Sequence, residues 1–409
     1  MVVDTDEATR ARHEMTDGLV AAGKITDGRV EAAFRCVPRE AFMPEGTTLE
    51  AAYNPDDAVF TKVGPGGEVL SSLSAPFIQA RQIEQAGIGP GDTVLEIGSG
   101  GLNAALIAEV VGESGRVFTV DIDPDVTTRA SAALDATGYT SRVVVHLADA
   151  EHPIPDLGSV DAIVVTAGAW DLSPAWLAHL APTGRLAVPL RMNGITRSIG
   201  FRRVGDHLES QTLEECGFVP MQGDGAHHDR TFVLPDPAGN AVDLRFDADP
   251  PGDLGKLDGV LSGPRTESWS GVTIPYGVSF ADLILWFACR LPGFCRITAE
   301  PGTALAREKV GRDRFPFGIV DGGSIAYLAS RPAGETRDSG AEYGARGWGD
   351  AAAVQTLAAE LRAWDEAGRP SPDSITYWPH GSDHARIPDQ AAVLEKEHGL
   401  VAISWSTAD

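Results

Sequence analysis

The stretch that decides the fold is VLEIGSGGLNAALIAEV, residues 94–110. A short apolar run carries Glu96, a turn with three glycines follows, and a helical pattern begins at about Asn103. Glycines allow backbone N–H groups to approach a ligand without a Cβ in the way. The stretch therefore predicts a ligand-binding turn between a buried strand and a helix.

Strand and helix patterns alternate around this stretch, from residue 93 to about residue 205. The strand-like runs are too continuous in their apolar residues to be exposed on one side. They are TVLEI, RVFTV, RVVVHL, DAIVVT and GRLAVPL, and the helical patterns between them are NAALIAEVVG, DPDVTTRASAALDATG and SPAWLAHLAP. This alternation predicts an α/β fold with a Rossmann-like parallel sheet covered by helices on both faces.

The segments that flank this core predict further parts. Residues 6–44 read as two helical pieces, residues 53–69 as a loop, and Ser74 as the N-cap of a helix opened by Pro76. The composition shifts near residues 225–245, and six of the eight tryptophans lie beyond residue 230. We predict an N-terminal helical segment and substrate-side loop (1–75), a binding core (76–225) and a C-terminal α/β or α+β domain (245–409).

The glycine turn excludes two common nucleotide sites. No lysine followed by serine or threonine closes the turn, so the sequence does not form a P-loop. A dinucleotide site would require G-x-G-x-x-G, whereas the glycines here are Gly98, Gly100 and Gly101. The turn alone does not identify the ligand.

Acidic residues at successive strand ends point to S-adenosyl-L-methionine. Asp121 ends the second strand, where it can accept from both ribose hydroxyls, and Asp149 follows the third, where it can accept from the adenine amino group. Glu96 lies near the expected place of the ligand's ammonium group. The alternative is that each acid only caps a helix. The predicted cofactor contacts are Glu96, Gly98, Ser99, Gly100, Asp121, Ile122, Asp149, Ala150 and Thr166.

Composition and charge exclude other classes. The net charge is −25 and the pI about 4.7, which argues against binding a nucleic-acid backbone. No apolar run reaches the roughly 18–20 residues that cross a membrane, and the polar start lacks a signal-peptide pattern, so we expect a cytoplasmic protein without membrane contact. The four cysteines lack metal-site spacing, and no metal is expected.

The chain resembles the protein-L-isoaspartate O-methyltransferase family over about residues 30–222. The matching pieces occur in the family's order: VPREAFMP, SSLSAP, VLEIGSG, DAIVVTAGA, LAPTGRLAVPL and FVPMQG. The turn EIGSGGLN departs from the family's EIGTGSGY because it is one residue shorter and has Leu102 in place of the aromatic residue. The C-terminal domain is a second departure, because the compact repair enzymes lack it.

This extended shape resembles a branch associated with lanthipeptide and other ribosomal-peptide gene clusters, the FxLD-system methyltransferases. The resemblance implies that an aspartate side chain of a modified precursor peptide is esterified and then closes to a succinimide or opens to isoaspartate. The alternative is general repair methylation of L-isoaspartate or D-aspartate. Ser74 matches the family's Ser-x-Pro and is the candidate catalytic residue, with the helix cap as its other interpretation. The C-terminal domain would recognise the peptide. The choice of aspartate or isoaspartate and the oligomeric state stay open.

Overall fold

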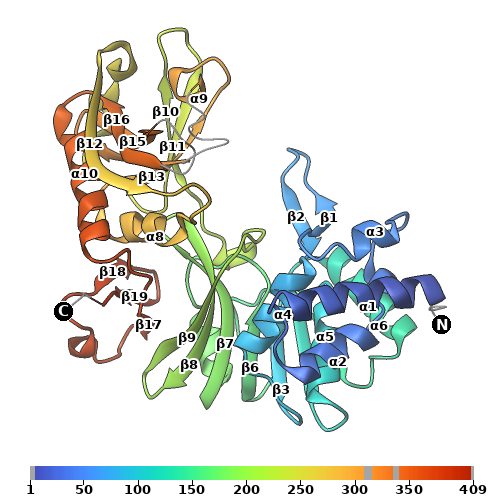
Figure 1. Cartoon of the computed structure of the whole chain (residues 1–409). Coiled ribbons are helices and arrows are strands. Elements are labelled where there is room, and N and C mark those ends of the chain that lie inside the picture. Colours follow the sequence, from blue (N-terminus) through green and yellow to red (C-terminus); the bar gives the residue numbers. More distant parts are fainter. Residues whose placement is uncertain (1–4, 308–315, 335–339, 407–409) are drawn as a thin grey trace.

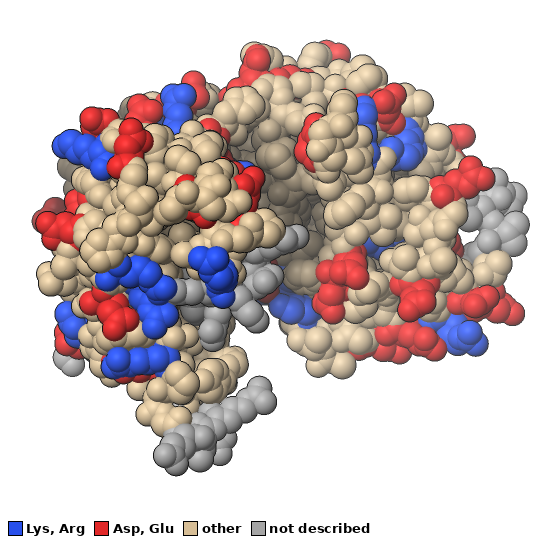
Figure 2. Space-filling view, turned by 90° about the horizontal axis from the view of Figure 1, so that it is seen from above, with Lys and Arg blue, Asp and Glu red and all other residues tan. Residues whose placement is uncertain are grey.

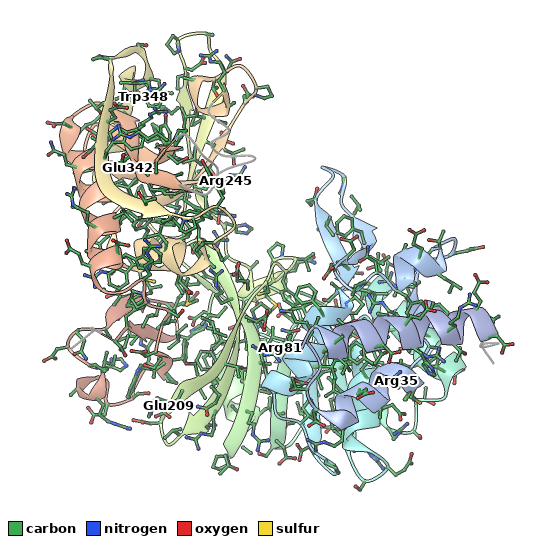
Figure 3. The ribbon with its side chains drawn as sticks, viewed as in Figure 1. Arg35, Arg81, Glu209, Arg245, Glu342 and Trp348 are labelled. Atoms are coloured by element: carbon green, nitrogen blue, oxygen red, sulfur yellow. The ribbon has the colours of Figure 1, made fainter. Side chains whose placement is uncertain are left out.

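The computed structural model describes residues 5–307, 316–334 and 340–406, which form two lobes (Figure 1). The first, the core lobe, holds a ten-stranded sheet, and the second lobe holds a seven-stranded sheet. Arg81 and Glu209 mark the core lobe in Figure 3, whereas Glu342 and Trp348 mark the second lobe. No helix in these described ranges is both long enough and apolar enough to span a membrane.

The N-terminal residues form helices and one hairpin. The segment predicted as a loop, residues 53–69, contains the strand Val59–Val63 and the turn after it; this strand pairs antiparallel with Val69–Leu73, and the hairpin projects from the core lobe (Figure 1). Glycines at 64, 66 and 67 make the turn between the two strands, and this cluster of glycines is the signal of a hairpin in the sequence. The elements are α1 (Asp6–Ala21), α2 (Gly28–Cys36), η1 (Arg39–Phe42), α3 (Leu49–Ala52), β1 (Val59–Val63), β2 (Val69–Leu73) and α4 (Pro76–Gln85).

The alternating region forms the predicted Rossmann-like sheet. Its parallel part has the order β7-β6-β3-β4-β5, and β8 and β9 continue it antiparallel beyond β7. The elements are β3 (Thr93–Ile97), α5 (Leu102–Val111), β4 (Arg116–Asp121), α6 (Pro124–Thr137), β5 (Val143–Leu147), β6 (Val160–Val165), α7 (Pro174–His179), β7 (Leu180–Met192), β8 (Ile195–Val204) and β9 (His207–Glu215). The class of fold predicted for the core is confirmed.

The second lobe contains an antiparallel sheet with the order β10-β11-β13-β14-β15-β16-β12, and α10 packs against it. It is therefore of the α+β type. The elements are η2 (Gly223–Gly225), β10 (Arg230–Pro235), β11 (Ala241–Phe246), η3 (Leu254–Leu257), η4 (Val260–Ser262), β12 (Arg265–Ile274), α8 (Ala281–Arg290), β13 (Phe294–Ala299), α9 (Ala304–Arg307), β14 (Phe317–Asp321), β15 (Ser324–Pro332), β16 (Ala341–Trp348) and α10 (Ala351–Glu366).

The last strands return to the core sheet. β17 (Ser374–Pro379) pairs antiparallel with β9, and β19 (Gly399–Ser404) and β18 (Ala392–Glu395) extend the sheet beyond it, with η6 (His384–Arg386) between β17 and β18. A boundary near residues 225–245 separates the core sheet from the sheet of the second lobe up to α10. The strands after α10 belong to the core sheet again. The domain limits given above stay a prediction.

Strand alternation divides the core lobe into two apolar layers. Val94 on β3 faces the layer that contains α5, which lies between the sheet and α2 and is buried on nearly every side. Leu95 faces the opposite layer, which continues into the second lobe through α8. The apolar α8 helix is a core element, as its sequence indicates, and it joins the lobes through one continuous core.

Candidate active site

The glycine turn after β3 needs its glycines for conformation and for space. Gly98 has φ +97°, a region that L side chains rarely adopt. A Cβ there would lie 2.4 Å from Oγ1 of Thr166. That hydroxyl donates to the carbonyl oxygens of Ile97 (3.1 Å) and Gly98 (2.9 Å), so it links the ends of β3 and β6. The turn is therefore held in one conformation by the Thr166 side chain and by the backbone conformation of Gly98.

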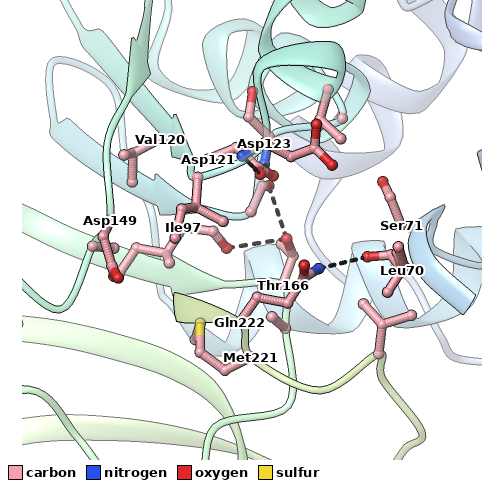
Figure 4. Close-up of a pocket in the computed structure, with 18 of the residues that line it drawn as sticks. Leu70, Ser71, Ile97, Val120, Asp121, Asp123, Asp149, Thr166, Met221 and Gln222 are labelled. Atoms are coloured by element: carbon pink, nitrogen blue, oxygen red, sulfur yellow. Dashed lines mark hydrogen bonds between the residues drawn. The ribbon is translucent and has the colours of Figure 1, made fainter. Parts of the chain in front are cut away.

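A first cavity lies over this turn at the carboxyl ends of the parallel strands (Figure 4). Eight of the nine predicted cofactor residues line it, and Glu96 is the exception. The roles of the eight as cofactor contacts stay predictions. The lining residues are Leu70, Ser71, Ser72, Ile97, Gly98, Ser99, Gly100, Val120, Asp121, Ile122, Asp123, Val126, Ala148, Asp149, Ala150, Thr166, Ala167, Val219, Pro220, Met221 and Gln222.

Two carboxylates in this cavity are oriented by backbone amides. Asp121 accepts from the N–H of Ser99 at one oxygen and from that of Asp123 at the other, both at 2.9 Å. Burial raises the pKa of Asp121, and these backbone hydrogen bonds oppose that rise. Asp149 likewise accepts from the N–H groups of Glu151 (2.9 Å) and Asp224 (2.8 Å). Both side chains are thus fixed before any ligand arrives.

Glu96 lies behind the turn and not in the cavity. Because side chains alternate along β3, Glu96 shares the face of Val94 and points toward the α5 layer. Its carboxylate is fully buried and accepts from Oγ1 of Thr119 at 2.5 Å. Burial raises the pKa of Glu96 to about 7. The predicted contact with a ligand ammonium group has no support in this position.

The segment 219–223, which includes most of FVPMQG, covers the first cavity. It is held to Gly168, whose N–H donates to Val219 O at 2.7 Å and whose carbonyl accepts from Met221 N at 3.0 Å. The side chain of Gln222 donates to Leu70 O at 3.0 Å, across the cavity (Figure 4). These covering residues were not predicted, although FVPMQG was recognised as a motif.

Gly223 ends this covering segment and leaves room for the acidic wall. It has φ +76°, and a Cβ there would lie 2.2 Å from Oδ2 of Asp149. A side chain at this position would displace the Asp149 carboxylate from the amide of Asp224. The glycine that ends FVPMQG therefore leaves room for the Asp149 carboxylate.

A second cavity, which we call the acceptor groove, adjoins the first. The two share the wall formed by Leu70, Ser72, Val219 and Pro220, and Ser74 lines the groove. The lining residues of the groove are Asp56, Ala58, Phe60, Glu68, Val69, Leu70, Ser72, Ser74, Ala75, Phe77, Ile78, Cys216, Gly217, Phe218, Val219 and Pro220.

Ser74 does not cap the helix that follows it, so that interpretation is wrong. The N-cap of α4 is Ala75, and no side chain bonds the helix start. Pro76 has no N–H to offer, and the N–H of Phe77 donates to Pro55 O at 3.1 Å. The Ser74 hydroxyl is therefore available to the groove.

Arg39, from the VPREAFMP motif, fixes the backbone at Ser74. Its guanidinium is buried and donates to Ser74 O at 2.8 Å and to Ala52 O at 2.6 Å. Burial lowers the pKa of Arg39 to about 10, which leaves it charged at neutral pH. The motif thus connects the N-terminal helices to the candidate catalytic residue.

One acidic cluster borders the first cavity. Asp149, His152 and Asp224 bring their ligand atoms within 4.8 Å of one another. His152 Nε2 is 2.8 Å from Asp224 Oδ2, and the N–H of Asp224 donates to Asp149. The three residues are partners of one another.

Comparisons with known proteins bear on both cavities. A family model described as Protein-L-isoaspartate(D-aspartate) O-methyltransferase (PCMT) matches residues 10–226, which include both cavities. A protein-L-isoaspartate O-methyltransferase of Roseiflexus sp. (strain RS-1) is 36% identical over 214 residues, 52% of this chain and 92% of that protein. One of Hyperthermus butylicus is 31% identical over 230 residues, 54% of this chain and 92% of that protein.

A solved structure extends the similarity to the second lobe. This structure, a protein-L-isoaspartate O-methyltransferase, has a TM-score of 0.50 at 20% identity and covers 89% of this chain and 96% of its own. At that identity the likeness concerns the fold. The similarity of fold therefore reaches the second lobe.

Proposed function

Because the chain belongs to the protein-L-isoaspartate(D-aspartate) O-methyltransferase family, we propose that it methylates the free carboxylate of an isoaspartyl residue in a peptide or protein. The chain is an S-adenosyl-L-methionine-dependent protein carboxyl methyltransferase. The observation that supports the proposed acceptor site is the wall shared by the two cavities, with Ser74 on the groove side. A methyl donor in one cavity and a carboxylate in the other would meet at this wall.

The first cavity fits the cofactor by the chemistry of its wall. Its glycines let the turn pack closely, because a Cβ at Gly98 or Gly100 would collide with Thr166 or Leu73. Asp121 and Asp149 are fixed acceptors at two strand ends. Asp121 would hold the ribose hydroxyls, and Asp149 would lie toward the adenine. The cofactor supplies an activated methyl group, and the transfer is an in-line displacement.

The protein's part in this reaction is alignment and exclusion of water. A peptide carboxylate has a pKa near 4 and is ionised at pH 7, so the reaction needs no strong general base. The Ser74 hydroxyl would donate to the acceptor carboxylate and orient it. The apolar side chains of Leu70 and Val219 in the shared wall would remove water from the path.

A second candidate acceptor is the aspartate side chain of a modified ribosomal peptide of the lanthipeptide type. The shortened glycine turn motivates it, because the turn separates this chain from the usual EIGTGSGY of its family. Leu102, at the position of the family's aromatic residue, is only 1% exposed and lies outside the cavity lining. The product of this reaction would close to a succinimide or open to isoaspartate. We also propose that residues 245–409 contribute to gripping such a peptide, because the surface is hollowed between the lobes (Figure 2).

One assay separates these acceptors. The purified enzyme receives the cofactor and three peptides of equal sequence: linear isoaspartyl, linear aspartyl, and aspartyl closed by a thioether ring. The expected result is a mass gain of one methylene on the isoaspartyl peptide. Methylation of the ring peptide alone, or its loss of one water through the succinimide, would favour the second candidate. No methylation of any peptide by cofactor-bound enzyme would overturn both.

A further inference from the structure

The acceptor groove has an apolar wall that is unusually open to solvent. Phe60 on β1 is 60% exposed, although a large aromatic side chain gains free energy by burial. Phe77 and Phe218, both partly exposed, line the same groove. The three aromatic residues come from the hairpin, from α4 and from the segment after β9. Together they offer contact area to a side chain of a bound peptide.

Two carboxylates lie in the same groove. Asp56 and Glu68 are exposed, and among the described residues that line the groove none is a lysine or arginine. Nearby lysines have other partners. Lys62 pairs with Asp123 at 2.6 Å on the α6 side of the hairpin, and Lys24 pairs with Glu214 at 2.7 Å. The lining of the groove is therefore apolar and negatively charged.

This charge opposes the reaction that the groove would serve. The acceptor is an anion, it approaches a chain of net charge −25, and Asp121 and Asp123 line the adjoining cavity. A cation on the peptide next to the acceptor would offset the repulsion. Its aliphatic stem would cover the exposed ring of Phe60, and its charged end would meet Asp56 and Glu68.

We propose that the acceptor groove selects peptides that carry a lysine or arginine within a few residues of the methyl-accepting carboxylate. The proposal rests on the proposed function, because it takes Ser74 and the shared wall as the place of the acceptor. Asp56 and Glu68 then determine specificity and take no part in the chemistry. The groove would disfavour acceptors embedded in acidic sequence.

The test uses two series of short synthetic peptides, one isoaspartyl and one aspartyl, each with lysine, glutamine or glutamate at one flanking position. The expected ratio of kcat/KM for lysine over glutamate is about fivefold, the size of one or two exposed ion pairs. The ratio should fall below about twofold in the double variant Asp56→Asn, Glu68→Gln. It should also shrink when the ionic strength is raised.

Asp57→Asn is the matched control, because it removes a carboxylate from the same loop but from outside the groove lining. It should keep the lysine preference. An equal rate for all three flanking residues, a preference for glutamate, or a lysine preference that survives in the double variant would overturn the proposal. Each of these outcomes is a ratio of kcat/KM values among peptides of one series, so it can be measured in whichever series the enzyme methylates. Absence of turnover in both series is a different result and would count against the proposed function itself.

Discussion

The two adjoining cavities of the core lobe are built in different ways. In the first, backbone N–H groups hold Asp121 and Asp149, and glycines let the turn pack closely against its neighbours. In the acceptor groove, the walls are side chains such as Phe60 and Phe218, brought from segments far apart in the chain. A backbone wall suits one invariant ligand, whereas a side-chain wall can vary with the substrate. Under the proposed function, the first cavity would therefore fix the chemistry, and the acceptor groove would select the peptide.

The largest effect is expected where the backbone wall is broken. Gly98→Ala places a methyl group at φ +97° and within 2.4 Å of Thr166 Oγ1, whose two hydrogen bonds close the turn. Backbone strain and the loss of those bonds together cost about 4 kcal/mol. Urea unfolding should show this loss, and calorimetry should show cofactor affinity lowered by more than about 100-fold. Unchanged affinity would mean that the turn does not shape the first cavity.

The same contrast explains what the sequence could predict. The turn, the strand ends and eight lining residues follow from local spacing, because glycines and acids at strand ends occupy fixed places in a parallel sheet. The position of Glu96 was also predictable. It lies two residues after Val94, so alternation places it on the same face of the sheet as Val94, toward α5 and away from the cavity.

The parts that escaped prediction depend on contacts between distant segments. Gln222 reaches Leu70 across 152 positions, and Tyr377 on β17 pairs with Leu208 on β9. Nothing in the local pattern of residues 374–404 distinguishes a strand of the core sheet from one of the second lobe. Pairing partners in a sheet are set by the whole fold, so a single sequence shows the strand but not its neighbour.

Behind the backbone wall, Glu96 should make folding depend on pH. Its pKa of about 7 in the folded state exceeds the ordinary value of 4.5, so the folded state keeps a proton that the unfolded state has lost. Stability is therefore lost as the pH rises from about 4.5 to 7, by about 3 kcal/mol in total, and stays constant above. Glu96→Gln should lack this loss.

Urea unfolding at several pH values between 5 and 8 measures this difference. The free energy of unfolding of Glu96→Gln should rise relative to the wild type across that range. Glu50→Gln, an exposed position on α3, serves as the control and should keep the wild-type profile. Parallel profiles for Glu96→Gln and the wild type would show that the buried carboxylate does not carry the pH dependence.

The smallest effects are expected from single hydrogen-bonding groups, and they should separate the two cavities. Asp121→Ala removes a charged acceptor from the first cavity and should weaken cofactor binding by about 2 kcal/mol, roughly 30-fold in Kd. Ser74→Ala removes a neutral hydroxyl from the groove and should lower kcat by about fivefold, with cofactor Kd unchanged. Calorimetry and single-turnover methylation provide the two measurements.

If Ser74→Ala weakened cofactor binding, or if Asp121→Ala lowered only the rate at saturating cofactor, the assignment of the cofactor to the first cavity and of the acceptor to the groove would be wrong. If Ser74→Ala kept the kcat of the wild type, the Ser74 hydroxyl would not orient the acceptor, and the apolar wall alone would do so.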